Sequence, residues 1–65
     1  MIRLTERRGK TSLVNPARIL YCDEEPTQEY RRVALTDNMW IEVMETLDEI
    51  EALIEKSVIK IQLFR

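Results

Sequence analysis

The hydrophobic period of this sequence changes at Thr46, and that change constrains the fold more than any other feature. Before Thr46, segments such as residues 2–5 and 30–36 alternate apolar and polar side chains, which is typical of half-buried strands. Thr46 followed three residues later by Glu49 matches a capping box, so the sequence predicts that a helix starts here. Beyond this point the apolar residues recur at the spacing of one helix face: Leu47, Ile50, Leu53 and Ile54.

Turn residues divide the rest of the chain into five short segments. Gly9 lies in a polar run suited to a hairpin, because glycine accepts positive φ without steric penalty. Pro16 and Pro26 each end an extended run, and Asp37-Asn38 predicts a two-residue turn. The expected strands are residues 2–5, 11–14, 19–24, 30–36 and 39–43, with a single turn over 16–18.

These elements predict one small α+β domain spanning residues 1–65. The expected architecture is a curled antiparallel sheet of about five strands, with one C-terminal helix packed on it. Strict alternation would place Met39 on the core face, and Ile19 on the same face as Tyr21. The expected core consists of Ile2, Leu4, Leu13, Ile19, Val33, Leu35, Ile41, Val43, Leu47, Ile50 and Ile54.

The C-terminal residues 58–65 fit two patterns. Their apolar residues continue the helical stripe, but from Ile59 to Leu63 they also alternate with polar residues, as in a strand. Because β-branched residues cluster there, we favour a helix that ends near Ser57 and is followed by an extended tail. This tail is a candidate oligomer contact.

The small size of the chain raises the question of how it is stabilised. A domain of 65 residues buries only about 60 % of the surface that its unfolded chain exposes, so its core is marginal. A single cysteine excludes an internal disulfide, and the lack of histidine leaves too few soft ligands for a zinc cluster. Self-association or docking on a partner protein remains as the expected source of added stability.

No residue pattern indicates catalysis, a cofactor or a metal site. Cys22 is followed by three carboxylates, whose charge raises the pKa of a thiol, so we interpret it as structural. The acidic residues lack the spacing of a calcium loop, and the arginines before Gly9 lack the spacing of a phosphate-binding loop. We therefore expect a protein that is not an enzyme.

Apolar residues on expected solvent faces indicate a protein interface. Trp40 and Met44 alternate with core residues in the fifth strand, and aromatic and methionine side chains are enriched at interfaces. A competing interpretation is that singly exposed apolar residues are ordinary, or that the tail covers them. The candidate interface for a protein partner or a homo-oligomer comprises Leu20, Trp40, Met44, Ile59, Ile61, Leu63 and Phe64.

The charge distribution supports an alternative function. The net charge is −2, which makes nucleic acid an unfavoured partner, but basic residues gather near the N-terminus while residues 42–55 are acidic. The alternative is a small phage-type regulatory or inhibitor protein that binds nucleic acid or mimics it through its acidic helix. The possible basic patch comprises Arg7, Arg8, Lys10 and Arg18.

No segment has the length and apolar character of a membrane span, and no signal peptide is recognisable at the N-terminus. Together with the single cysteine, this predicts a cytoplasmic protein.

The order of these segments resembles the short FlbD-type flagellar protein family over about residues 1–54. The resemblance implies a small, cytoplasmic, non-enzymatic protein linked to flagellar motility. The chain departs from the family in having Asp37-Asn38 where members favour Asn-Gly, and in having Leu20, Trp40 and Met44 at polar positions. These departures leave open a related small protein with another role, such as one carried by a phage. The resemblance is carried by Leu4-Thr5, Asn15-Pro16, Ile19, Pro26, Leu35-Thr36, Ile41, Val43, Glu45-Thr46 and Ile50.

Overall fold

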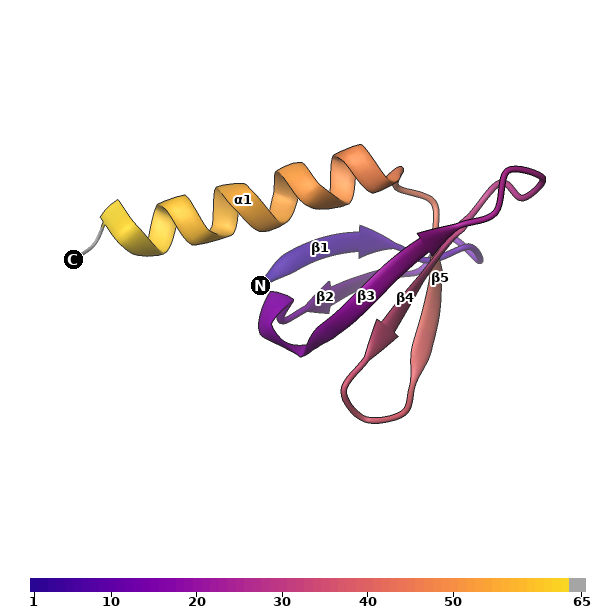
Figure 1. Ribbon diagram of the computed structural model, residues 1–65, viewed down its shortest axis with the longest axis horizontal. Helices are drawn as coiled ribbons and strands as arrows, with labels where there is room; N and C mark the ends of the chain where they lie inside the picture. Colours follow the sequence, from indigo (N-terminus) through magenta and orange to yellow (C-terminus); the bar gives the residue numbers. More distant parts are fainter. Residues whose placement is uncertain (64–65) are drawn as a thin grey trace.

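Five antiparallel strands in two small sheets, with a C-terminal helix packed on them, confirm the predicted α+β class. The computed structural model describes the backbone of residues 1–63 and the side chains of residues 1–57. The sheets are β1-β2 and β3-β4-β5. The elements are β1 (Ile2–Thr5), β2 (Thr11–Val14), the 3-10 helix η1 (Pro16–Arg18), β3 (Ile19–Glu24), β4 (Arg31–Leu35), β5 (Trp40–Val43) and α1 (Leu47–Leu63), as Figure 1 shows.

The two hairpins close in the same way, through three-residue loops whose last residue has positive φ. In the β1–β2 hairpin the Glu6 N–H donates to the Lys10 carbonyl at 2.7 Å, and Gly9 has a φ of 94°. In the β4–β5 hairpin the Leu35 N–H donates to the Met39 carbonyl at 2.7 Å, and Asn38 has a φ of 59°. The predicted two-residue turn at Asp37-Asn38 is therefore wrong, because only Asn38 adopts the left-handed conformation that a three-residue loop requires.

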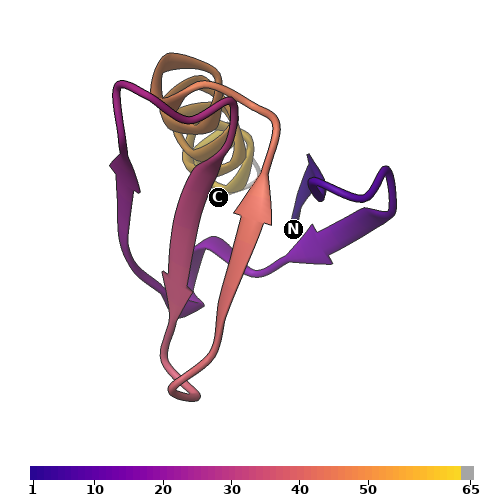
Figure 2. The ribbon, with the colours of Figure 1, turned by 90° about the vertical axis from the view of Figure 1, so that its right-hand side faces the viewer.

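An isolated bridge between Glu6 and Val43 joins the two sheets. On either side of it, the Met44 N–H donates to the Thr5 carbonyl and the Arg7 N–H donates to the Glu42 carbonyl, both at 2.8 Å. The end of β1 thus lies beside β5, and the strands follow one another around a curl in the order β2-β1-β5-β4-β3 (Figure 2).

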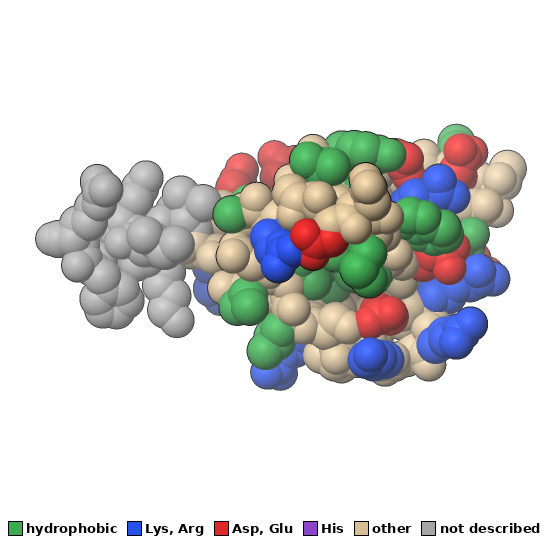
Figure 3. Space-filling model, turned by 90° about the horizontal axis from the view of Figure 1, so that it is seen from below, with side chains coloured by type: hydrophobic (Ala, Val, Ile, Leu, Met, Phe, Trp, Pro, Cys, Tyr) green, Lys and Arg blue, Asp and Glu red, His purple; other side chains and the backbone are tan. Residues whose placement is uncertain are grey.

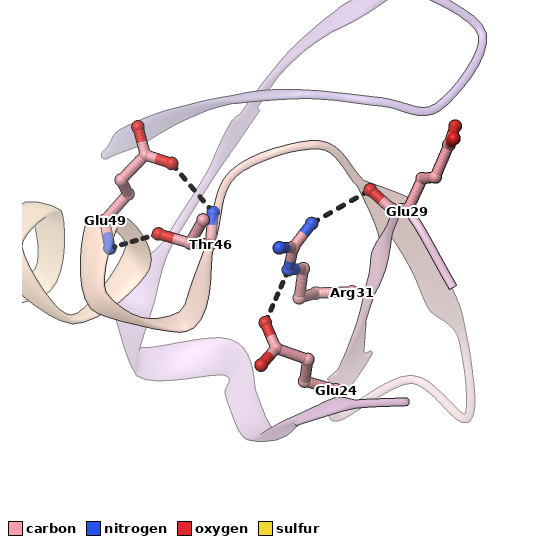
Figure 4. A network of polar contacts seen from close by, with 5 residues as sticks. All are labelled: Glu24, Glu29, Arg31, Thr46 and Glu49. Atoms are coloured by element: carbon pink, nitrogen blue, oxygen red, sulfur yellow. Dashed lines mark hydrogen bonds and ion pairs between the residues drawn. The ribbon is translucent and has the colours of Figure 1, made fainter. Parts of the chain in front are cut away.

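The helix begins at the predicted residue. The Thr46 N–H donates to Glu49 Oε1 at 2.9 Å, and the Glu49 N–H donates to Thr46 Oγ1 at 3.1 Å, which completes the capping box (Figure 4). Nearby, Arg31 Nε donates to the Glu24 carboxylate at 2.7 Å, and Arg31 Nη1 donates to the Glu29 carbonyl at 2.9 Å. These bonds hold together the two ends of the loop between β3 and β4.

Glu45 ties the helix start to β1. Its two carboxylate oxygens accept the Thr5 N–H at 2.8 and 3.0 Å, across 40 residues of sequence. The same residue, Thr5, accepts the Met44 N–H through its carbonyl. Both backbone groups of Thr5 are therefore satisfied by the segment that leads into α1.

The core lies between the curled strands and α1. Several predicted core residues are fully buried. Leu4, Val33 and Val43 each have 0 % of their surface exposed. The half-buried side chains packed against these are Ile19, Cys22, Leu35, Ile41, Leu53 and Ile54. Among the residues whose side chains are described, the buried core cluster consists of Ile2, Leu4, Val14, Val33, Val43 and Ile50.

Leu13 is not a core residue, and the register of the first hairpin gives the reason. Ile2 lies opposite Val14, so Val14 shares the core face and is buried. Leu13 lies opposite Arg3 on the other face, where 61 % of its surface is exposed. The strand pattern alone does not distinguish Leu13 from Val14, because both are apolar and only the pairing decides which faces inward.

Two further face assignments are wrong. Met39 is exposed because it lies beyond the last paired residues of β4 and β5, at the hairpin end remote from α1 in Figure 1. In β3 the register shifts between Ile19, opposite Leu35, and Tyr21, opposite Ala34. This β-bulge inserts one extra residue, so Tyr21 leaves the face of Ile19 and becomes exposed.

The helix also continues further than expected. α1 extends to Leu63, so the extended conformation favoured for the tail is wrong over residues 58–63. Neither glycine nor proline interrupts this segment, and continued helical hydrogen bonding therefore prevails over strand propensity. The conformation of residues 64–65 lies outside the described residues.

Replacing Glu45 by alanine should destabilise the fold by about 1–2 kcal/mol, because it leaves the partly buried Thr5 N–H without its acceptor. Urea unfolding followed by circular dichroism measures this loss. Glu45→Gln should recover part of it, since the amide oxygen can still accept the hydrogen bond. An alanine variant as stable as the parent would show that the contact between Glu45 and Thr5 does not stabilise the fold.

Glu49 should make the stability of the protein depend on pH. The hydrogen bonds that its carboxylate makes with the Thr46 backbone and hydroxyl hold the pKa of Glu49 below its ordinary value of 4.5. The stabilisation is therefore complete above that value and is lost as the pH falls through the folded pKa.

Urea unfolding at neutral and at acidic pH tests this dependence. The difference in stability between the parent and Glu49→Gln should be larger at neutral pH than at about pH 3, because the stabilisation by the ionised carboxylate decreases as the pH falls. Glu55→Gln serves as the control, because Glu55 lies on the same helix away from the cap. An equal difference at both pH values would contradict the role of the ionised carboxylate.

Candidate functional site

The three predicted interface residues in the sheet are all exposed. Leu20 in β3, Trp40 in β5 and Met44 just after β5 expose 64 %, 54 % and 43 % of their surfaces. The side chains of the other four predicted interface residues lie outside the described residues: Ile59, Ile61, Leu63 and Phe64.

Trp40 belongs to a row of side chains across the three-stranded sheet. Ala34 of β4 lies opposite both Tyr21 of β3 and Trp40 of β5, so Tyr21, Ala34 and Trp40 form one cross-strand row, which we call the aromatic row. Ala34 is buried although it points away from the face of Val33, because it is the short side chain between two large ones. Tyr21 and Trp40 are both more than half exposed.

Tyr21 is an interface candidate that the sequence did not identify. In an unbroken strand it would face inward with Ile19, and only the bulge turns it to the outer face. Leu20 and Tyr21 are consecutive residues of β3 and are both exposed. This breaks the in-and-out alternation of a regular strand and marks the position of the bulge. The outer face of this sheet is therefore more aromatic than simple alternation predicts.

A row of alternating charges lies beside the aromatic row. Asp23, Arg32 and Glu42 are cross-strand neighbours in β3, β4 and β5, and Arg7 Nη1 lies 3.7 Å from Glu42 Oε1. We call these four residues the charge ladder. The Arg32 guanidinium lies over the Trp40 ring, 4.7 Å from its centroid, and so connects the ladder to the aromatic row.

Tyr30 extends the ladder towards the loop after β3. The Arg7 guanidinium lies 4.4 Å from the centroid of the Tyr30 ring. A hydrogen bond to the Glu42 carboxylate is the main reason why the pKa of Tyr30 is raised, and the charges of Arg7 and Arg32 oppose this shift. The Tyr30 hydroxyl is thus a neutral donor at physiological pH.

Met44 lies apart from the aromatic row. Along β5, Glu42 of the charge ladder stands between Trp40 and Met44. Met44 instead helps to line a shallow depression of about 500 Å³, together with Arg7, Tyr30 and the loop residues 27–29. Figure 3 views the molecule from the side opposite the helix and shows several hydrophobic patches with charged side chains between them. Trp40 and Met44 therefore do not form one continuous apolar surface.

The structure divides the predicted basic patch. Arg7, Arg8 and Lys10 lie at the turn between β1 and β2. Arg18 lies in η1 at the opposite end of the strands in Figure 1, where it pairs with Asp37 and donates to Thr36 Oγ1 at 3.4 Å. The four residues thus do not share one surface.

Cys22 faces the helix from β3 and is half-buried. Burial, followed by the neighbouring charge of Asp23, raises the pKa of the Cys22 thiol, so the thiol stays protonated at neutral pH. Within the described part of the chain, no three His, Cys, Asp or Glu residues lie where they could hold a metal ion together. No helix over these residues has the length and apolar character needed to cross a membrane.

Comparison of the chain with protein-family models, with curated proteins and with solved structures found no match. The similarity to the FlbD-type family accordingly stays a prediction from the residues that carry it.

Proposed function

We propose that this protein is a non-enzymatic protein-interaction module that docks through the aromatic row and Leu20. The observation that carries the proposal is the exposure of Tyr21 and Trp40 on one sheet face, on either side of the short side chain of Ala34. Aromatic side chains provide large contact areas at a low cost in conformational entropy, which is why they dominate interface energies. Their position on paired strands holds them in place before a partner binds.

The charge ladder supplies the polar rim of this surface. The charges of its four residues alternate in sign across the sheet, so a partner meets both positive and negative groups rather than a surface of one sign. Such a rim orients a partner and discriminates against wrong partners more than it adds affinity. Arg32 lies over the Trp40 ring and is suited to pair with a partner carboxylate when the ring is covered.

A protein partner fits this surface better than nucleic acid does. Arg7 is paired with Glu42 and Arg18 with Asp37, whereas a phosphate backbone is bound by clustered basic side chains that are free to contact it. Mimicry of nucleic acid requires a continuous acidic surface, and on the face of the aromatic row Asp23 and Glu42 alternate with basic residues of the charge ladder.

The biological setting of the proposal rests on the sequence resemblance. A flagellum-associated role in the cytoplasm is what the FlbD-type pattern implies, and a phage-encoded relative with another role is the alternative. Because Leu20 and Trp40 are among the departures from that pattern, we propose that they give this chain a partner of its own.

Substitution of the aromatic row should affect binding far more than folding. Trp40→Ser should change the free energy of unfolding by less than about 1 kcal/mol, because the ring is more than half exposed and loses mainly its contact with Arg32. Val33→Ala, at a fully buried position of the neighbouring strand, should destabilise the fold clearly more. Urea unfolding compares the two, and a Trp40→Ser loss as large as that of Val33→Ala would assign Trp40 to the core.

Site-specific photo-cross-linking tests the proposed surface in cells of the organism that encodes the chain. A photoreactive amino acid at position 20, beside the aromatic row, should yield a protein adduct of defined mass, and adding Trp40→Ser should abolish it. Position 13 is the matched control, because Leu13 and Leu20 are similarly exposed, at 61 % and 64 %, on different sheets. Equal cross-linking from positions 13 and 20, or none from either, would contradict the proposal.

A further inference from the structure

A second surface, on the other side of β3 from the aromatic row, has the features of a peptide-binding site. β3 is an outer strand of its sheet, with β4 as its one partner among the described residues. The backbone groups on its outer edge are therefore free to pair with another extended chain. Figure 2 shows β3 at the edge of the sheet, and α1 lies between β3 and β1, both of which it contacts.

An apolar groove runs between this edge and the helix. It has a volume of about 300 Å³, and Cys22 is the strand residue that lines it. The opposite wall comes from one face of α1, where Leu47, Ile50 and Ile54 supply apolar surface. Because β3 is an outer strand, the groove opens directly beside the free strand edge. A side chain from an added strand could enter it.

The polar residues around the groove are acidic. Glu51 and Glu55 of α1 line its rim and are both exposed. On the strand side, Glu24 lies on the same face of β3 as Cys22, and its charge is compensated by Arg31. Glu51 and Glu55 therefore line the groove without an ion pair among the described residues, and they favour a ligand that carries positive charge.

The same charges disfavour a second copy of this chain at this edge. Pairing two β3 edges about a two-fold axis, with both helices on one face, would bring the Glu51 and Glu55 rims of both copies to one interface. Like charges brought together at an interface disfavour association. The acidic edge thus prevents self-pairing while leaving the groove open to a basic chain.

We infer that the β3 edge and the groove beneath α1 bind an extended segment of a partner protein. The segment adds to β3 as a further strand, inserts an apolar side chain between Cys22 and Ile54, and places Lys or Arg side chains on either side to meet Glu51 and Glu55. The inference does not depend on the aromatic row, which lies on the opposite face of the sheet.

A designed peptide tests this site directly. The probe is acetyl-TKTITKT-amide, in which alternation puts the isoleucine and both lysines on one face of an extended chain. Its control is acetyl-TKPIPKT-amide, which keeps these three side chains and the charge, but its prolines prevent regular strand pairing. NMR titration should show shifts at the backbone amides of Tyr21–Glu24 and Leu47–Glu55, with affinity at least about ten-fold higher for the first peptide.

Charge-reversal variants separate the groove from net charge. Glu51→Lys with Glu55→Lys should weaken binding of the probe at least about ten-fold, while Glu25→Lys with Glu29→Lys, which changes the net charge equally, should weaken it less than about two-fold. Trp40→Ser should leave binding unchanged, so failure here and failure of the proposed function are separate results. Equal affinity for both peptides, shifts centred on Trp40, equal effects of the two double variants, or no binding would each overturn the inference.

Discussion

The junction at Thr5 is the constraint on which the rest of the structure depends. Its N–H is held by the Glu45 carboxylate and its carbonyl by the Met44 N–H. These bonds join the first strand to the start of the helix and, with the bridge between Glu6 and Val43, turn two small sheets into one curled layer. Without this junction each sheet would have only two or three strands, which is close to the minimum for a stable sheet.

The core reflects this arrangement. Leu4 on β1 and Val43 on β5 become fully buried because the junction brings their strands together beneath Ile50 of the helix. In a chain of 65 residues every such contact matters, since net stability is a small difference between large opposing terms. The capping box at Thr46 adds a local contribution by fixing where the helix begins.

The bulge at Leu20 determines what β3 presents on its two sides. It turns Tyr21 outward to join Trp40 in the aromatic row, and it directs Cys22 towards the helix, where Cys22 lines the apolar groove. One inserted residue therefore creates both surfaces for which we propose partners. The outer surface combines aromatic rings with charges of both signs, whereas the groove is apolar with an acidic rim. The two surfaces are consequently suited to different ligands.

The sequence by itself determined which elements form and in what order, because these depend on local chemistry. The capping box, the positive-φ positions at Gly9 and Asn38, and the alternation around Val33 each act over a few residues. The exposure of Trp40 followed from the same alternation. These signals were sufficient to predict the α+β class, the approximate positions of the strands and most of the core residues.

Only the tertiary structure decided which faces and charges come together. The pairing register buried Val14 in place of Leu13, and the bulge exposed Tyr21. Pairing across strands also put Glu42 of the charge ladder between Trp40 and Met44, and it placed Arg18 at the opposite end of the strands from Arg7. Such features depend on contacts between residues distant in sequence. A shift of one residue in register reverses every side chain of a strand, and local pattern does not specify it when both neighbours are apolar.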